Sequence, residues 1–172
     1  MIGFPNPVNE KAARTVAGGV LLIASATLVL SLTAGHGWLW VSAPLAAGFI
    51  ARVLTGPKLS PLGQLATRVI APRLGEPKLV AGPPKRFAQG VGVVFTGGAT
   101  AFVATGHPLG AQILLGGIII AAGLESIFGY CLGCKVFAIL MRFGLIPAET
   151  CEACNNVQAH LDEIARRAEA TV

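Results

Sequence analysis

The stretch TVAGGVLLIASATLVLSLTA, residues 15–34, decides the class of fold. It contains no charged side chain and has about the 20 residues that an α-helix needs to cross the hydrocarbon core of a bilayer. A secretory signal has a shorter apolar run of about 7–15 residues, so we expect a permanent span. Because the bilayer core offers no water to the backbone, the span must be helical.

Three further segments have the same character: residues 38–54, 87–105 and 111–130. The whole chain of 172 residues is 53% hydrophobic with a mean hydropathy of +0.70, and only 12% of it is charged, against about 25% in soluble domains. The sequence therefore predicts an all-α integral membrane protein. Its four transmembrane helices form two hairpins within residues 1–144.

The distribution of basic residues predicts the orientation in the membrane. The net charge is +5, but the charges lie between apolar runs, which argues against a nucleic-acid partner. The joints within each hairpin are uncharged, whereas basic residues flank both hairpins: Lys11, Arg14, Lys58, Arg68, Arg73, Lys78, Lys85, Arg86, Lys135 and Arg142. By the positive-inside rule, we expect a cell inner membrane protein with both termini and the middle segment in the cytoplasm.

The middle segment SPLGQLATRVIAPRLG, residues 60–75, predicts a short amphipathic helix. Ser60 is a favoured N-cap, Pro61 suits the first helical position, and Pro72 ends the run. Two placements are open. The helix lies on the inner membrane surface, where basic neighbours attract anionic lipid at about 1 kcal/mol each, or it packs on the end of the bundle.

The four cysteines, Cys131, Cys134, Cys151 and Cys154, form two C-x-x-C pairs separated by sixteen residues. This spacing matches a four-thiolate zinc site, which would pin the cytoplasmic tail, residues 145–172, to the bundle and dock a partner. A thiol-redox or sulfur-relay role is the alternative. It needs a lowered thiol pKa, which a helix N-terminus supplies, and Thr150 could cap a soluble C-terminal helix with Cys151 in its first turn. Inert packing is the third possibility.

Three stretches, SPLGQLATRVIAPRLG, PPKRFAQGVGVVF and FGYCLGCKVF, resemble a bacterial membrane family called domain of unknown function 4395. The resemblance covers nearly the whole chain. It implies four spans with the first cysteine pair at the end of the last one, and a link to sulfur metabolism through thioredoxin-like or sulfurtransferase partners. The second pair, CEAC, resembles the actinobacterial part of the family. The resemblance brings no established activity.

One carboxylate, Glu125, lies within the fourth predicted span, where an unpaired charge is costly. Its expected partners are Arg52, near the inner end of the second span, and Gln89 on the third. We predict a structural Glu125–Arg52 pair. A proton relay is disfavoured because the spans hold no second acid to receive the proton.

The chain lacks a phosphate-binding glycine loop, a Ser-His-Asp order and paired carboxylates. We therefore expect an accessory protein rather than a self-contained enzyme, with a four-cysteine site on the cytoplasmic face. A subunit of a larger membrane complex is a further alternative. The spacing of the cysteines favours zinc, and the family resemblance favours thiol chemistry.

Overall fold

The computed structural model describes residues 4–145, so the predicted C-terminal helix and the second cysteine pair lie outside the described residues. The helices and strands are β1 (Val8–Asn9), α1 (Glu10–Thr33), η1 (His36–Val41), α2 (Ser42–Thr55), η2 (Gly56–Lys58), α3 (Pro61–Leu65), η3 (Ala66–Ile70), η4 (Ala71–Leu74), β2 (Leu79–Val80), α4 (Gly82–Ala104), α5 (Pro108–Gly123), η5 (Leu124–Phe128) and α6 (Leu132–Arg142). The all-α class is confirmed, and the two short strands only tie the start of the chain to the segment before α4.

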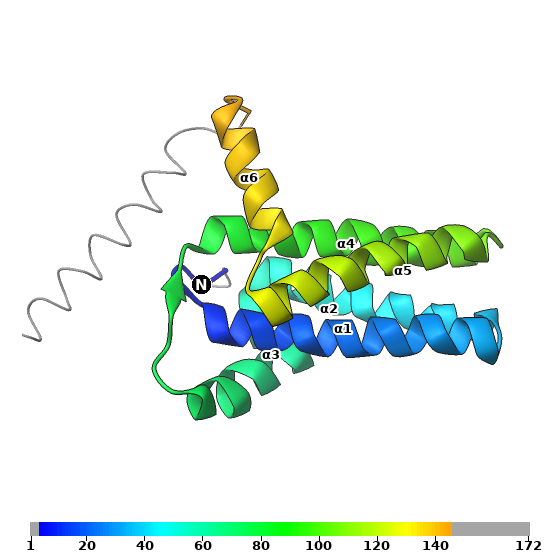
Figure 1. The fold of residues 1–172 in the computed structure, drawn as a ribbon, viewed down its shortest axis with the longest axis horizontal. Helices are drawn as coiled ribbons and strands as arrows, with labels where there is room; N and C mark the ends of the chain where they lie inside the picture. Colours follow the sequence, from blue (N-terminus) through cyan, green and yellow to red (C-terminus); the bar gives the residue numbers. More distant parts are fainter. Residues whose placement is uncertain (1–3, 146–172) are drawn as a thin grey trace, which may run out of the picture.

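Four helical stretches are long and apolar enough to cross a membrane (Figure 1), and they match the four predicted spans, three of which were predicted to end one or two residues later. Their bounds are Glu10–Thr33, His36–Leu74, Gly82–Ala104 and Pro108–Phe128. The second stretch contains η1, α2 and the middle segment. The third begins five residues before the predicted start at Phe87, because Pro83 and Pro84 occupy the first turn of α4, where a missing N–H costs nothing.

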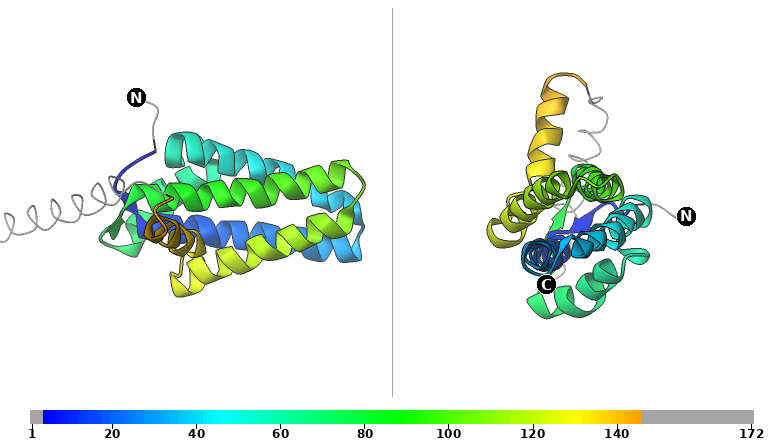
Figure 2. Two further views of the ribbon diagram at one scale, coloured as in Figure 1. Left: turned by 90° about the horizontal axis from the view of Figure 1, so that it is seen from above. Right: turned by 90° about the vertical axis from the view of Figure 1, so that its right-hand side faces the viewer.

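The helices form a bundle in which α2 packs mainly on α4, α4 on α5, and α5 on α1 (Figure 2). The helices α1 and α2 touch only slightly, although the short η1 turn joins them. Consequently α2 and α5 lie diagonally across the bundle, with α4 in contact with both. This arrangement determines which polar side chains can meet.

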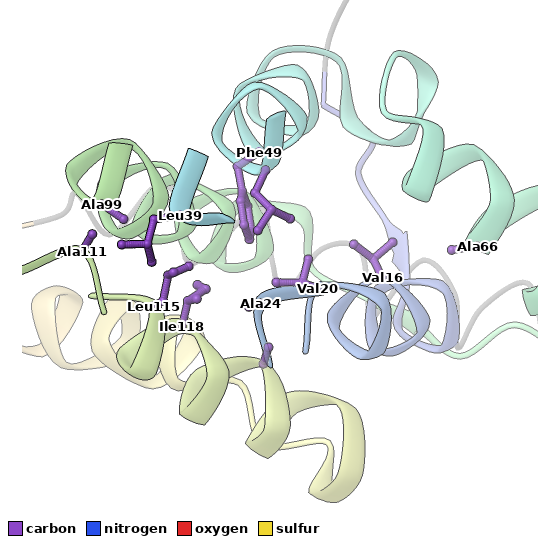
Figure 3. Packing of buried hydrophobic residues seen from close by; sticks show 12 residues of the cluster. Val16, Val20, Ala24, Leu39, Phe49, Ala66, Ala99, Ala111, Leu115 and Ile118 are labelled. Carbon is purple, nitrogen blue, oxygen red and sulfur yellow. The ribbon is translucent and has the colours of Figure 1, made fainter. Parts of the chain in front are cut away.

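The centre of the bundle is built from small and medium apolar side chains (Figure 3). Ala24, Leu39, Ala99 and Leu115 are completely buried. Larger apolar side chains such as Leu22 are exposed, as expected of a surface that faces lipid tails rather than water. Alanine at close contacts lets the helices approach, which is how packing stabilises bundles in a bilayer.

The predicted middle helix is present as the continuous turns α3, η3 and η4. Ser60 caps it, since its Oγ accepts a hydrogen bond from the Gly63 N–H at 3.3 Å. The segment packs along α1, with Ala66 buried, while Leu65 and Val69 stay exposed. The packing of this segment on the bundle is thus confirmed, along α1, whereas its placement on the inner membrane surface stays a prediction.

The fourth span ends at Phe128, and the chain then turns sharply at Gly129, whose φ of +69° suits glycine. Two carbonyls of the π-helical turn η5, those of Ser126 and Ile127, accept hydrogen bonds from Arg14 at 3.1 and 3.0 Å. The following helix α6 leaves the bundle at a steep inclination (Figure 1) and packs on α4. After this turn a separate helix, α6, begins, and Cys131 is its N-cap residue.

Candidate functional site

The first cysteine pair opens helix α6. Cys131 is the N-cap residue: its Sγ accepts a hydrogen bond from the Cys134 N–H at 3.3 Å. The Sγ atoms of Cys131 and Cys134 lie 2.7 Å apart, and Cys131 is buried. The sequence placed this pair at the end of the fourth span and sought a helix N-terminus only at Cys151. The structure places the first pair, too, at a helix N-terminus, which is the geometry that lowers a thiol pKa.

The two thiols differ in acidity. The pKa of Cys131 is lowered, chiefly because the Cys134 thiol donates a hydrogen bond to its sulfur. Burial and the Glu125 carboxylate oppose this effect, whereas the Lys85 ammonium reinforces it. The pKa of Cys134 is raised, first by that same hydrogen bond and then by burial. Cys131 is therefore the more acidic thiol of the pair, and Cys134 the less acidic one.

Lys85 forms a buried ion pair beside the thiols. Its Nζ lies 2.7 Å from Oε1 of Glu125, and the two side chains are only 8% and 14% exposed. Lys85 comes from the first turns of α4, and Glu125 from η5 at the end of the fourth span. The pair joins these two elements directly under the start of α6. The charges of the pair act on both thiols.

The predicted Glu125–Arg52 pair is wrong. Arg52 donates instead to Oε1 of Gln89 at 2.8 Å and to Oγ of Ser60 at 2.9 Å. The reason is the diagonal placement of α2 and α5: Arg52 on α2 reaches α4 and the start of α3, whereas Glu125 faces Lys85 on α4. Gln89 is thus a partner of Arg52 rather than of Glu125.

Arg52 has its own surroundings. It is 5% exposed, its guanidinium stacks on the Phe49 ring with 4.3 Å between Cζ and the ring centroid, and Nη2 has no hydrogen-bond partner among the described residues. Two hydrogen bonds and the aromatic contact hold the guanidinium in one orientation. We assign this cluster to the packing of α2 on α4 and α3.

Sequence reasoning missed Lys85, which it counted among the charges of the middle segment. The signal was available: the Pro83-Pro84 dipeptide marks a helix start before Lys85, so Lys85 and Gln89 are four residues apart on one helical face. An ion pair across two spans needs two charges of opposite sign. Lys85 and Arg52 were the available cations, and only the packing of the helices chooses between them.

No group of three or more potential metal ligands comes together within residues 4–145. The predicted zinc site needs Cys151 and Cys154, which lie outside the described residues, so it stays a prediction. What the described part of the chain brings together is one dithiol and one ion pair. Cys131, Cys134, Lys85 and Glu125 meet where α4, the fourth span and α6 converge.

These features define a multi-pass α-helical membrane protein with a buried dithiol where its last span ends. The family described as Domain of unknown function (DUF4395) matches residues 8–142, and the chain belongs to this family. The match contains all four spans and the first cysteine pair, which confirms the expected family. No curated protein and no solved structure matches the chain.

Proposed function

We propose that this chain is a membrane-bound thiol–disulfide exchange protein whose reactive centre is the dithiol of Cys131 and Cys134. The observation that supports this most is the position of both sulfurs, 2.7 Å apart at the N-terminus of α6. A disulfide needs about 2.05 Å between its sulfurs, so oxidation requires only a small movement. The lowered pKa of Cys131 supplies the thiolate that starts exchange.

Each residue has a defined role in this reaction. The Cys131 thiolate attacks one sulfur of a partner's disulfide, and the partner's other sulfur leaves as a thiolate. Cys134 then loses its proton and attacks Cys131, which releases the partner as a dithiol and leaves the Cys131–Cys134 disulfide. The partner is reduced by two electrons and this chain is oxidised by two. Lys85 and Glu125 bracket the thiols with opposite charges, and Lys85 favours the Cys131 thiolate.

The geometry of the pair supports exchange better than zinc binding. Two thiolates on one tetrahedral zinc, each about 2.3 Å from the metal, lie about 3.8 Å apart. The observed separation is 2.7 Å, closer to a disulfide than to a metal site. In our proposal the tail pair, Cys151 and Cys154, exchanges two electrons with the first pair by the same thiol–disulfide step. Zinc held by all four cysteines is the competing prediction.

The surroundings of the protein are part of the proposal. The basic flanks favour a cytoplasmic position for the dithiol in a cell inner membrane. The family resemblance favours thioredoxin-like or sulfurtransferase proteins as partners, or a larger membrane complex. Exposed Leu65 and Val69, with Arg68 between them, favour contact of the middle helix with anionic lipid.

The test compares full-length protein with a variant that carries Cys151→Ser and Cys154→Ser, both in lipid nanodiscs. Each is equilibrated with mixtures of reduced and oxidised glutathione, and free thiols are counted by alkylation and mass spectrometry. The variant should still form one disulfide, between Cys131 and Cys134, in a single two-electron step. Adding Cys134→Ser to this variant should leave a stable mixed disulfide on Cys131.

Metal analysis of the same samples decides between the two predictions. Exchange predicts purified protein without stoichiometric metal. About one zinc per chain, released when any one of the four cysteines is replaced, would establish the zinc site instead. Thiols that stay reduced at every glutathione ratio would overturn the exchange function.

A further inference from the structure

Cys131 separates two cavities of different character. The first, of about 350 Å³, opens at the surface and is lined by Glu10, Lys85, Cys134, Tyr130, Lys135 and Cys131 itself. Its charged rim suits the approach of a polar partner. The second, the inner cavity of about 300 Å³, lies between the bundle helices and the first turns of α6 and is partly open, and Cys131 also lines it. Cys131 therefore lines both a polar surface pocket and an apolar cavity, and a soluble partner accounts only for the first.

The inner cavity is apolar apart from three side chains. Its walls come from α1, α2, α4, α5 and the start of α6 and include the rings of Phe49 and Phe95. A Cβ on Gly92 would overlap the Phe49 ring, and one on Gly117 would overlap the Phe95 ring. The absence of a side chain at these two positions leaves room for the two rings. The volume is at the lower limit of ordinary small-molecule sites, which measure about 300–1,000 Å³.

Cys131, Glu125 and Gln89 are the polar side chains in this lining. Oε1 of Gln89 accepts the hydrogen bond from Arg52, which orients the amide. Its NH₂ group donates no hydrogen bond among the described residues. The cavity therefore offers an apolar space, an amide donor and a thiol that can exchange electrons.

We propose that the inner cavity binds the ring of a lipid-soluble quinone, which exchanges two electrons with the Cys131–Cys134 dithiol. This inference rests on the exchange function proposed above and names its second substrate. A quinone fits because its ring is flat and apolar, its carbonyls accept hydrogen bonds, and it takes up two electrons with two protons. Lipid chains carry out no such exchange, and a folded protein cannot enter a 300 Å³ cavity.

The reaction balances without a further reagent. The Cys131 thiolate bonds to a ring carbon of the quinone, and Cys134 then attacks the Cys131 sulfur. The S–S bond forms as the C–S bond breaks, and its electron pair passes to the ring. The proton of Cys134 and one proton from water, which replaces the proton that Cys131 released on forming its thiolate, end on the two oxygens of the quinol. The surface pocket then admits a soluble partner in its dithiol form, which runs the exchange described above in reverse and reduces the disulfide again.

The experiment mixes reduced full-length protein carrying Cys151→Ser and Cys154→Ser with decylubiquinone under anaerobic conditions. Quinol formation is followed by absorbance, and disulfide formation by alkylation. In that background, Ala121→Leu fills the inner cavity, which Ala121 lines. Ala101→Leu is the matched control, since Ala101 is exposed and lies away from the cavity. Exchange with oxidised glutathione is measured for every variant.

We expect one quinol per dithiol, a rate reduced about tenfold or more by Ala121→Leu, and no change with Ala101→Leu. Exchange with glutathione should persist in both, which shows that the dithiol is intact. Quinone reduction that Ala121→Leu leaves unchanged would overturn the cavity as the site. Glutathione exchange without any quinone reduction would overturn this inference and leave the exchange function standing. Failure with both oxidants would overturn both.

Discussion

The two ends of the bundle are held by different kinds of polar contact. At the turn end, where η1 joins α1 to α2 and residues 105–107 join α4 to α5, the buried contacts are neutral. Ser42 meets Thr100 at 2.9 Å, and the Gln112 amide donates to Ser31 at 3.3 Å. At the cysteine end, defined by the dithiol and the Lys85–Glu125 pair, the contacts are charged.

This difference supports the cysteine end, rather than the turn end, as the candidate functional site. Neutral hydroxyl contacts join helices at low desolvation cost and change little with pH or redox state. A buried ion pair is expensive to desolvate and is weak evidence for stability alone. Intramembrane charges are accordingly associated with function, and here the pair lies beside two thiols. The turn end holds the helices together, and in our proposal the cysteine end carries the reactive dithiol.

The largest expected effect is at Lys85. Replacing Lys85→Met leaves the Glu125 carboxylate buried without its cation, which should lower the free energy of unfolding by about 3–5 kcal/mol. At about 2–4 °C per kcal/mol, the thermal midpoint in detergent should fall by about 6–20 °C. Scanning fluorimetry measures it.

Two matched variants sharpen this result. Adding Glu125→Gln to Lys85→Met removes the stranded charge and should recover much of the lost stability. Lys78→Ala breaks the pair with Glu10, where the Lys78 side chain is 71% exposed, and should cost at most about 1 kcal/mol. Equal losses of unfolding free energy for Lys85→Met and Lys78→Ala would mean that breaking the buried ion pair at the cysteine end costs no more than breaking an exposed one.

The fold was predictable because hydropathy and length are local properties of the sequence. Residues 15–34 and the three later apolar runs could only be helices in a bilayer, and Ser60 and Pro61 marked the start of the middle helix. The end of the fourth span was harder to place. Gly129 signals a turn, yet nothing local shows that the apolar residues after it form a separate helix that leaves the bundle.

The sequence drew attention to three of the four side chains of the candidate site, but neither to Lys85 nor to the pairing. The C-x-x-C motif and the lone intramembrane acid drew attention to Cys131, Cys134 and Glu125. The cation opposite Glu125 depends on which helices are neighbours, and the hairpin order alone does not give the diagonal placement of α2 and α5. Arg52 was therefore chosen where Lys85 is the partner.

A second prediction concerns the contact that places α6. A Cβ on Gly133 would lie 2.6 Å from Cα of Ala88, so Gly133→Ala should push α6 away from α4. We expect a loss of about 1–3 kcal/mol, typical of overpacking, together with faster alkylation of Cys131. Gly97→Ala on α4, where a Cβ would meet open space, should be neutral or stabilising by up to about 1 kcal/mol. Unchanged stability and alkylation in Gly133→Ala would disprove the close contact.

A smaller effect is expected at the turn end. Thr100 already donates to the carbonyl of Thr96 at 2.9 Å, so Ser42 is the donor in their contact. Ser42→Ala removes this donor and leaves only an acceptor lone pair unfilled, at a cost of about 0.5–1.5 kcal/mol. Thiol reactivity should not change. A change in the rate of Cys131 alkylation in Ser42→Ala would show that the turn end and the cysteine end are coupled rather than independent.

The last effect is expected at Cys134, at the cysteine end. It is the smallest effect on folding and the one most specific for thiol reactivity. Its thiol hydrogen bond is the main reason that the pKa of Cys131 is lowered. In Cys134→Ala, burial and Glu125 still raise this pKa while the largest opposing effect is lost, so the Cys131 thiolate forms only at higher pH. The rate of alkylation by iodoacetamide, measured against pH with Cys151 and Cys154 replaced by serine, should shift toward higher pH. Cys134→Ser keeps a hydroxyl donor and should shift the profile less. Superimposable profiles for all three proteins would mean that Cys134 does not activate Cys131, and would leave the two cysteines as neighbours without a shared reaction.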